Sequence, residues 1–431
     1  MMTLTAMQKY KTYKWSGNPF FGDIPSCWDI YPLFKIAKIK SIINKQDEEL
    51  LSVYLDRGVI KFSDVDEKRT NVTSLDLSKY QFVEKGDFVL NNQQAWRGSV
   101  GVSNHIGIVS PAYLVLSLSK EINPKYANYL FRDGSMVSQY LICSKGVGTI
   151  QRNLYWPHLR RTIVALPSYI EQTAIANFLD TKTNQIDEAI AIKEQQIALL
   201  NERKQILIQQ AVTQGLDPTV PMKDSGVEWI GKIPEHWEVR RSKFVFCQRK
   251  ERARPADIQL SATQAYGVIP QEQYEEMIGR KVVKISFHLE KRKHVEIDDF
   301  VISMRSFQGG LERAWASGCI RSSYVVLQPV NKKEIDAGFF SYMLKLPKYI
   351  NALQMTASFI RDGQDLNFDN FAQVDLFIPP IEEQKLIFSE IQLKVDEINK
   401  SIAIFMGQIT KYQEYKTTLI NSAVTGKIKV V

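Results

Sequence analysis

Hydrophobic residues recur at alternating intervals of three and four along two long stretches of the chain, 167–213 and 379–425. This spacing is typical of the a and d positions of a coiled coil. Pro167 and Pro379 stand where each helix begins, and Gly215 and Gly426 follow as stop signals. The pattern therefore predicts two helices of about 45 residues, each roughly 65–70 Å long. The residues of the predicted seam include Ile186, Ile190, Ile197, Leu200, Lys204, Ile398, Ile402, Phe405, Ile409 and Lys416.

A narrow apolar seam on an otherwise polar helix needs a partner that covers it. The two helices are similar and a globular module separates them, so we predict that they pair with each other, antiparallel and related by a pseudo-two-fold axis. Lys204 and Lys416 interrupt both seams at the same position. Matched polar interruptions of this kind more often set the register than add stability. The alternative, that each is a long core helix of a separate domain, stays open.

The two helical stretches are copies of one another, aligned without a gap and identical at 18 of 47 positions. The similarity extends upstream, because the pattern G-x-I-P-x-x-W occurs at 22–28 and again at 231–237. The chain therefore reads as module 1–165, helix 166–215, module 216–378 and helix 379–431. The modules have diverged much more than the helices, which indicates that the two copies share one role and differ in another.

Short apolar runs inside the modules predict strands, for example at 88–90, 114–116, 282–283 and 324–327. Apolar spacing around 126–130 and 339–344 predicts short helices. We therefore expect an α+β protein in which two mixed α/β modules are joined and followed by the long helices.

The basic excess of the chain is unevenly distributed. The full sequence has 55 Lys+Arg and 47 Asp+Glu, a net charge of +8. The first module has 21 basic and 14 acidic residues and the second 23 and 21, whereas the helices carry −2 and +1. This distribution favours modules that contact a polyanion and helices that contact protein.

Asn, Gln and Arg gather in each module between two predicted strands, and a second basic loop precedes each long helix. These side chains can make bidentate contacts with adenine or guanine edges. An ordinary surface loop is an equally good interpretation of this composition. The candidate DNA-binding residues are Asn91, Gln93, Gln94, Arg97, Lys145, Arg152, Arg305, Gln308, Arg313 and Arg361. Basic clusters at 248–254 and 291–294 could contact phosphate, although most charge runs are simply solvated.

The sequence carries no recognisable catalytic or metal-binding signature. It has neither a P-loop nor a G-x-S-x-G element, and its five histidines lack metal-ligand spacing. Asn18-Pro19-Phe20-Phe21 departs from the Asn-Pro-Pro-aromatic pattern of adenine methyltransferases, and we interpret it as a turn. The four cysteines form no CxxC pair, which fits a reducing cytoplasm, and no apolar run approaches the length of a membrane span.

Together, the duplicated G-x-I-P-x-x-W modules and the Pro-x-x-x-Glu-Gln helices ending in Ala-Val-Thr resemble the specificity (S) subunit of Type I restriction–modification systems. The resemblance covers nearly the whole chain from Gly22 onward. It implies a non-catalytic, cytoplasmic bacterial or archaeal DNA reader, not a membrane protein. Each module would be a target recognition domain that reads one half of a bipartite, asymmetric site in double-stranded DNA.

The resemblance also implies partners. The paired helices would set the spacer between the half-sites and dock two methyltransferase subunits, and restriction subunits would join the full complex. S-adenosylmethionine, ATP and Mg would be bound by those partners, so this chain is expected to hold no cofactor. Two alternatives stay open: a coiled-coil scaffold that pairs two ligand-binding modules without sequence-specific DNA recognition, and an enzyme with an unrecognised site.

Overall fold

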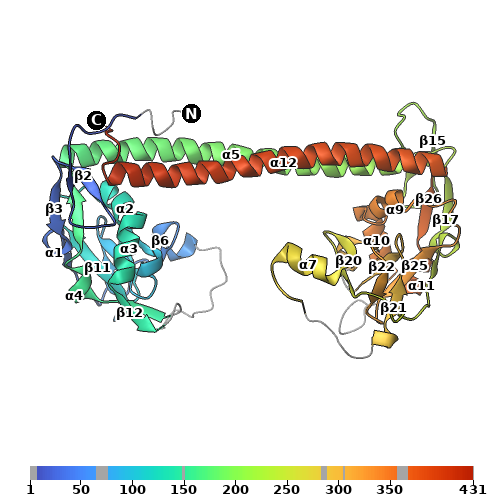
Figure 1. The fold of residues 1–431 in the computed structure, drawn as a ribbon, viewed down its shortest axis with the longest axis horizontal. Coiled ribbons are helices and arrows are strands. Elements are labelled where there is room, and N and C mark those ends of the chain that lie inside the picture. Colours follow the sequence, from blue (N-terminus) through green and yellow to red (C-terminus); the bar gives the residue numbers. More distant parts are fainter. Residues whose placement is uncertain are drawn as a thin grey trace. The chain divides into compact units, whose positions relative to one another are not determined.

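The structure of the chain is a computed structural model that describes residues 7–64, 76–147, 151–282, 289–303, 306–356 and 367–430. The chain divides into two compact units (Figure 1). Unit 1 consists of Met1–Glu194 and Met406–Val431, and unit 2 of Gln195–Phe405. The two long helices, α5 (Tyr169–Gln214) and α12 (Ile381–Val424), each contribute to both units. Each unit is therefore a module packed on part of both helices, and the proposed boundaries at 165, 215 and 378 stay a prediction about function.

The centre of unit 1 is a four-stranded antiparallel sheet in the order β4-β11-β8-β9. Five two-stranded ladders surround it, pairing β1 with β2, β3 with β14, β5 with β6, β7 with β10 and β12 with β13. The strands are β1 (Tyr13–Trp15), β2 (Asp23–Pro25), β3 (Asp29–Pro32), β4 (Ala37–Ile39), β5 (Leu51–Tyr54), β6 (Gly58–Lys61), β7 (Gln81–Val83), β8 (Phe88–Asn91), β9 (Val100–Val102), β10 (Gly107–Val109), β11 (Tyr113–Leu118), β12 (Ser144–Val147), β13 (Gln151–Leu154) and β14 (Ile163–Leu166).

Short helices connect this sheet to the long ones. Asn123 caps the first of two consecutive helices by accepting from the backbone amides of Lys125 and Tyr126, and Asp133 caps the second. The short helices are α1 (Leu33–Ile36), α2 (Pro124–Arg132), α3 (Gly134–Ile142) and α4 (Trp156–Leu159), with 3₁₀ turns η2 (Phe62–Asp64) and η3 (Ala95–Arg97).

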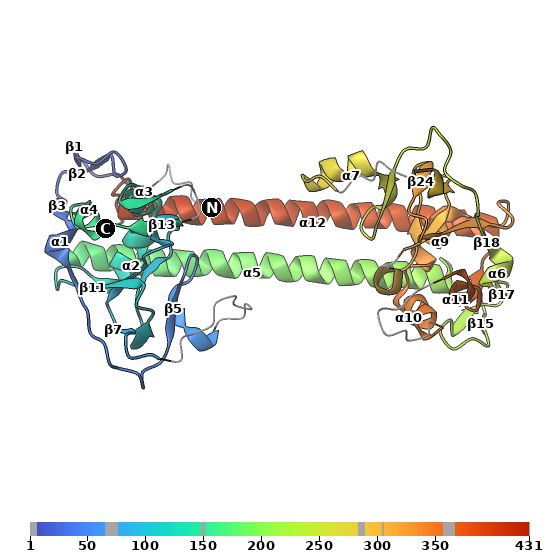
Figure 2. The same ribbon diagram turned by 90° about the horizontal axis from the view of Figure 1, so that it is seen from below.

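The main core of unit 1 joins the module to both long helices. It includes Leu179 near the start of α5 and Leu419 near the end of α12, both fully buried. The beginning of one helix thus lies beside the end of the other, so the helices run antiparallel in this unit (Figure 2). A smaller apolar cluster, with Val53 and Val109, fills the space among β5, β6, β7, β8, β10 and β11.

Unit 2 repeats this plan, with a four-stranded antiparallel sheet in the order β18-β25-β22-β23 and four ladders that pair β15 with β16, β17 with β26, β19 with β20 and β21 with β24. Its strands are β15 (Met222–Asp224), β16 (Lys232–Pro234), β17 (Glu238–Arg241), β18 (Phe246–Gln248), β19 (Leu260–Thr263), β20 (Gly267–Pro270), β21 (Lys293–Val295), β22 (Phe300–Ile302), β23 (Glu312–Arg313), β24 (Gly318–Ile320), β25 (Val325–Pro329) and β26 (Asp375–Ile378). Its helices are α6 (Ser242–Val245), α7 (Gln271–Ile278), α8 (Ser306–Gly309), α9 (Ala337–Met343), α10 (Pro347–Met355), α11 (Phe368–Ala372) and the 3₁₀ turn η4 (Leu289–Lys291).

The main core of unit 2 contains Val212 at the end of α5 and Ile391 near the start of α12, so the helices are antiparallel here too. The fold class predicted from the sequence is confirmed: mixed α/β modules are joined by long, paired helices. The predicted strands at 88–90, 114–116 and 324–327 fall in or overlap β8, β11 and β25, and the predicted short helices are α2 and α9. Val282 lies in no strand, and Val283 falls outside the described residues, so the strand predicted at 282–283 is not observed.

Candidate nucleic-acid interface

The repeated sequence motifs anchor each module to a long helix. Trp28 of the first G-x-I-P-x-x-W is fully buried, and its indole N–H donates to Glu171 Oε1 at 3.2 Å. Trp237 of the second copy donates in the same way to Glu383 Oε2 at 3.1 Å. Both carboxylates stand in the first turn of their helix, where the helix dipole favours a negative charge. The tryptophan of G-x-I-P-x-x-W and the glutamate at the start of the long helix thus form the same contact in both units.

The glutamine after each of these carboxylates acts as a second anchor. Gln172 accepts from the Asn123 backbone amide at 2.8 Å and donates to two backbone carbonyls. Gln384 repeats this with the Asp336 amide, also at 2.8 Å. Both side chains are buried with their hydrogen bonds made, as buried amides require. The residues that the copies share therefore position the modules, and selective contacts are left to residues that differ.

The seam lysines bridge the two long helices. In unit 1, Lys416 Nζ lies 2.6 Å from Asp187 Oδ2, and in unit 2, Lys204 Nζ lies 3.2 Å from Asn399 Oδ1. Positions 187 and 399 are equivalent in the repeat, so one cross-helix contact occurs twice, once as an ion pair and once to an amide. Of the other predicted seam residues, Ile186 and Ile398 are buried, whereas Ile190, Ile197, Leu200, Ile402, Phe405 and Ile409 are half-buried.

In unit 1 the structure brings the two predicted DNA-binding loops together at Trp96. The loop from β8 to β9 carries this residue on η3, and the indole N–H donates to the Gln93 carbonyl at 3.0 Å. The guanidinium of Arg97 lies 4.6 Å from the centre of the Trp96 ring. Arg152, on the β12–β13 hairpin, lies 5.7 Å from the same ring. Two cations on one aromatic ring make a compact, positively charged surface.

The hairpin is tied to this loop through its backbone, because the Leu154 amide donates to the Asn92 carbonyl at 3.0 Å. On the hairpin, Lys145 Nζ lies 4.1 Å above the Tyr155 ring. Asn91 closes β8 and shapes the loop, because its side chain accepts from the Gln93 amide and its carbonyl accepts from the Gln94 amide. Four candidates of the first module thus lie in this loop and two in the hairpin that packs on it, where Lys145 is paired with Asn153 and Arg152 with Gly146, on opposite faces of the hairpin. Trp96 and Tyr155 were not among the candidates, although aromatic residues interleaved with cations are a known signal for nucleic-acid binding.

In unit 2 the candidates are distributed differently. Gln308 on α8 is exposed. Arg313 is largely buried: its Nε and Nη2 donate to Asp298 Oδ1 at 2.8 and 2.6 Å, and its guanidinium lies 4.3 Å from the Trp315 ring. Arg305 and Arg361 lie outside the described residues. Of the second set, the described residues thus include Gln308, which is exposed, and Arg313, which is paired with Asp298.

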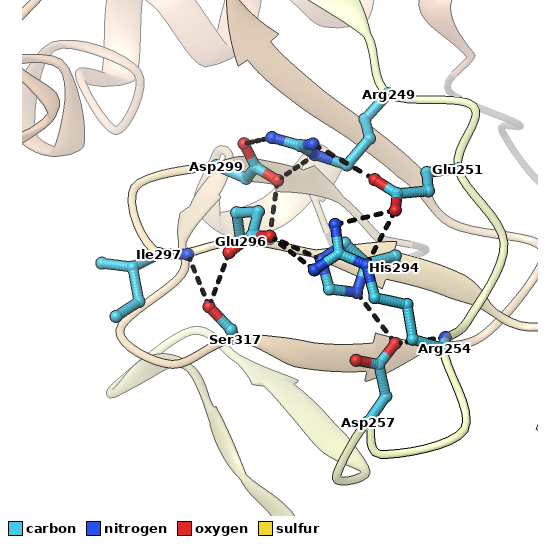
Figure 3. A network of polar contacts seen from close by, with 9 residues as sticks. All are labelled: Arg249, Glu251, Arg254, Asp257, His294, Glu296, Ile297, Asp299 and Ser317. Carbon is cyan, nitrogen blue, oxygen red and sulfur yellow. Dashed lines mark hydrogen bonds and ion pairs between the residues drawn. The ribbon is translucent and has the colours of Figure 1, made fainter.

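Two arginines of the basic cluster at 248–254 are paired with carboxylates within unit 2 (Figure 3). Arg249 Nε lies 2.6 Å from Asp299 Oδ2, and Arg254 contacts both Glu251 and Glu296. Arg249 and Asp299 are almost completely withdrawn from solvent. The second module has 23 basic residues against 21 in the first, and its smaller net charge comes from its 21 acidic residues, several of which form these pairs.

His294 lies at the centre of this network, 2.8 Å from Asp257 through Nδ1 and 2.8 Å from Glu296 through Nε2 (Figure 3). Burial alone lowers the pKa of His294, but the hydrogen bonds to Glu296 and Asp257 outweigh it and raise the pKa above 6.5. The hydrogen bond from His294 lowers the pKa of Glu296 to about 2. The geometry and the pKa directions agree on an imidazolium held between two carboxylates.

Metal ligands and membrane-spanning helices are the remaining features of interest in the described part of the chain. Among those residues, no group of three or more His, Cys, Asp and Glu side chains is arranged to hold a metal ion. No helix within the same ranges has the length and apolarity needed to cross a membrane. Asn18 starts a turn whose carbonyl accepts from the Phe21 and Gly22 amides, and its side chain donates to Gln139 at 2.7 Å. The Asn-Pro-Phe-Phe segment is thus a structural turn.

No protein-family model and no curated protein sequence matches the chain. Solved structures do. The HsdS subunit from Thermoanaerobacter tengcongensis is 14% identical, with 94% of this chain and 98% of that chain covered and a TM-score of 0.53. The chain has the fold of an HsdS subunit. A chain from a structure that describes complex assembly and conformational transition of the type I R-M system is 12% identical, with coverages of 93% and 98% and a TM-score of 0.65.

The HsdS fold confirms the resemblance to Type I specificity subunits that the duplicated motifs indicated. Because the likeness extends over nearly the whole of both chains, it includes both modules and both long helices. At 14% and 12% identity, the similarity concerns architecture and not individual contacts.

Proposed function

We propose that this chain is the non-catalytic DNA-recognition subunit of a Type I restriction–modification complex, and that each unit reads one half of a bipartite, asymmetric site. The observation that carries the proposal is the contrast within the repeat. The contacts that hold each module on the helices are the same in both units, whereas the polar residues on the modules differ. A protein that places two readers in equivalent positions and gives them different reading residues recognises an asymmetric sequence.

The surface around Trp96 supports DNA as the ligand of unit 1. Arg97, Lys145 and Arg152 contribute positive charge for phosphate, and Asn91, Gln93 and Gln94 are side chains that pair with base edges. The net charge of +7 on residues 1–165 favours the same polyanion.

The long helices are the proposed platform for two methyltransferase subunits. In unit 2, Leu199 and Ile206 on α5 are 63% and 48% exposed, and their seven-residue spacing places them on one face. Leu386 and Leu393 on α12 show the same spacing and are 59% and 62% exposed. Exposed apolar residues arranged along one face are typical of a surface that another protein covers. The S-adenosylmethionine chemistry would belong to those subunits, and ATP and Mg to the restriction subunits that join them.

The proposal that the helix pair sets the spacer can be tested by lengthening both helices in register. Position 204 faces 399, so a seven-residue insertion after Leu200 in α5 is matched by one after Ile402 in α12. A heptad keeps the seam continuous and adds about 10 Å, which corresponds to roughly three base pairs of DNA. We expect the assembled methyltransferase complex to methylate the same two half-sites with a longer spacer, as read by methylome sequencing.

An insertion in α5 alone is the matched control, because it shifts the seam and should abolish assembly. Altered half-site bases with an unchanged spacer would contradict the spacer role. A complex that assembles but gives no sequence-specific gel shift would instead favour a coiled-coil scaffold without DNA recognition.

A further inference from the structure

We infer that a cavity in unit 2 reads a guanine of the second half-site, an inference that rests on the proposed function. The cavity has a volume of about 640 Å³ and lies against the β19–β20 hairpin and the end of β24. Its lining includes two arginines and three tyrosines but, among the described residues, no Asp or Glu. The residues that carry the argument are Gln264, Tyr266, Tyr274, Arg292, Arg321 and Tyr324.

Arg292 is the buried donor of this cavity. The residue is only 8% exposed and stands immediately before β21. Its guanidinium lies beside the buried thiol of Cys319, where it partly offsets the rise in the pKa of that thiol that burial causes. A guanidinium shielded from water forms a stronger hydrogen bond with an acceptor in the cavity than a guanidinium on the open surface would form.

The network of Figure 3 includes His294 on β21, the strand that begins directly after Arg292. The Ala253 amide donates to the Arg292 carbonyl at 3.0 Å, which ties the 249–257 segment to the start of β21. His294, two residues further along, bonds Asp257 in that segment, and His294 pairs with Cys319 in the β21–β24 ladder. The charges of the network therefore fix the backbone from which Arg292 enters the cavity, as a precise binding site requires.

The lining selects the class of ligand. Arginine has only donors, so two arginines without a carboxylate select a group rich in acceptors. Phosphate and the O6/N7 edge of guanine both meet this condition, and a bidentate arginine–guanine pair is the commonest specific contact with DNA. The aromatic rings decide between them. Tyr266, 42% exposed, and Tyr274 lie on the cavity wall with their ring centres 6.3 Å apart and their planes inclined by 59°, so that either ring can offer its face to a base.

The equivalent place in unit 1 carries different residues. The registers of the two hairpins align Gln264 with Leu55 and Tyr266 with Arg57. The registers of β7–β10 and β21–β24 likewise align Arg292 with Tyr80 and Arg321 with Ser110. Neither arginine of the cavity has a counterpart in unit 1, so guanine reading at this place is a property of the second half-site only.

The experiment uses the complex assembled with its methyltransferase subunits and a DNA library randomised in both half-sites. Arg321 is exposed at the cavity, so Arg321→Gln leaves the core intact. Arg292→Lys keeps the charge but loses the bidentate fork. For both variants we expect the preference for guanine at one position of one half-site to fall roughly ten- to hundred-fold. The other half-site, the spacer and the affinity for non-specific DNA should not change.

Arg241→Gln is the matched control, because this exposed arginine of unit 2 lies outside the cavity lining and should leave every base preference unchanged. A uniform loss of affinity for all sequences, with a shallower salt dependence, would assign the cavity to phosphate and overturn the inference. Unchanged base preferences in a folded, active Arg321→Gln complex would overturn it as well. Failure of the unaltered complex to select any bipartite site would instead refute the proposed function itself.

Discussion

Each unit contains a buried ion pair at an equivalent position, but the residues next to this pair differ between the two units. In unit 1, Lys40 lies 2.6 Å from Asp87, and in unit 2, Arg249 lies 2.6 Å from Asp299. These pairs occupy equivalent places at the end of β4 and β18 and just before β8 and β22. The difference appears one strand away, where unit 1 has Phe82 and unit 2 has His294.

That single difference changes the surrounding electrostatics. In unit 1, Lys40 and Lys45 lie 5.3 and 5.8 Å from the centre of the Phe82 ring. In unit 2 the imidazole is enclosed by Asp257 and Glu296, and Arg254 joins the same carboxylates. Beside the shared ion pair, unit 1 thus places two lysines on an aromatic ring, whereas unit 2 places a histidine and an arginine against carboxylates. The residues that the two units share stabilise the scaffold, and the arrangement of charged side chains differs at the neighbouring positions that they do not share.

The largest expected effect concerns what the units share. Replacing Trp28 or Trp237 by Ala empties a fully buried site and removes the donor to Glu171 or Glu383, at a cost of about 3–5 kcal/mol in the free energy of unfolding. Hydrogen exchange should show the loss in the unit that carries the substitution. Trp315→Ala, at a half-exposed position, is the control. Equal loss of protection in both units from either variant would show that they do not unfold separately.

An intermediate effect should separate the units by pH. Because the folded-state pKa of His294 is raised above 6.5, its stabilisation is complete below pH 6.5 and is lost as the pH rises through the folded-state value. The pKa of Glu296 is lowered from 4.5 to about 2, so its stabilisation is complete above pH 4.5 and is lost as the pH falls through about 2. We expect the network to stabilise unit 2 most between about pH 4.5 and 6.5.

His294→Gln should reduce this pH dependence, because a side-chain amide stays neutral over this pH range and does not titrate. Proteolysis of the intact chain at increasing urea concentration, with the fragments assigned to unit 1 or unit 2, gives the unfolding midpoint of each unit at several pH values. His236→Gln, at an exposed residue of the same unit that contacts Glu383, is the matched control. A unit 2 midpoint that follows the same pH course in the His294 variant and the unaltered chain would rule out the network as its cause.

The smallest effect concerns the cross-helix lysines. Asp187→Asn should weaken the contact with Lys416, and Asn399→Asp should strengthen the contact with Lys204, each by less than about 1 kcal/mol because both sites are solvent-exposed. Thermal unfolding at low salt measures the difference, and high salt should abolish it. Equal changes at low and high salt would mean that charge does not distinguish the two contacts.

Much of the fold could be predicted because its signals are local. The 3/4 periodicity from Leu179 to Ala211 predicts the body of α5, since each apolar position lies on one helical face, and Pro167 and Gly215 place its ends within a few residues of those observed. The loop carrying Arg97 and the hairpin carrying Arg152, both named as candidates from the sequence, pack on each other, and their contact with DNA stays a prediction. The ion pair of Arg313 with Asp298, by contrast, depends on tertiary contacts that no spacing in the sequence reveals.

The sequence by itself determined that this protein is one module-and-helix unit written twice, with paired helices and diverged modules. It could do so because repetition and heptad spacing are properties of the linear order of residues. Only the tertiary structure decided that Trp28 bonds Glu171, that the basic residues of unit 2 are paired internally, and that Gln264, Arg292 and Arg321 line one cavity. Those residues come from segments far apart in the sequence, and their proximity follows from the packing of strands, turns and helices on one another, for which the order of residues carries no periodic signal.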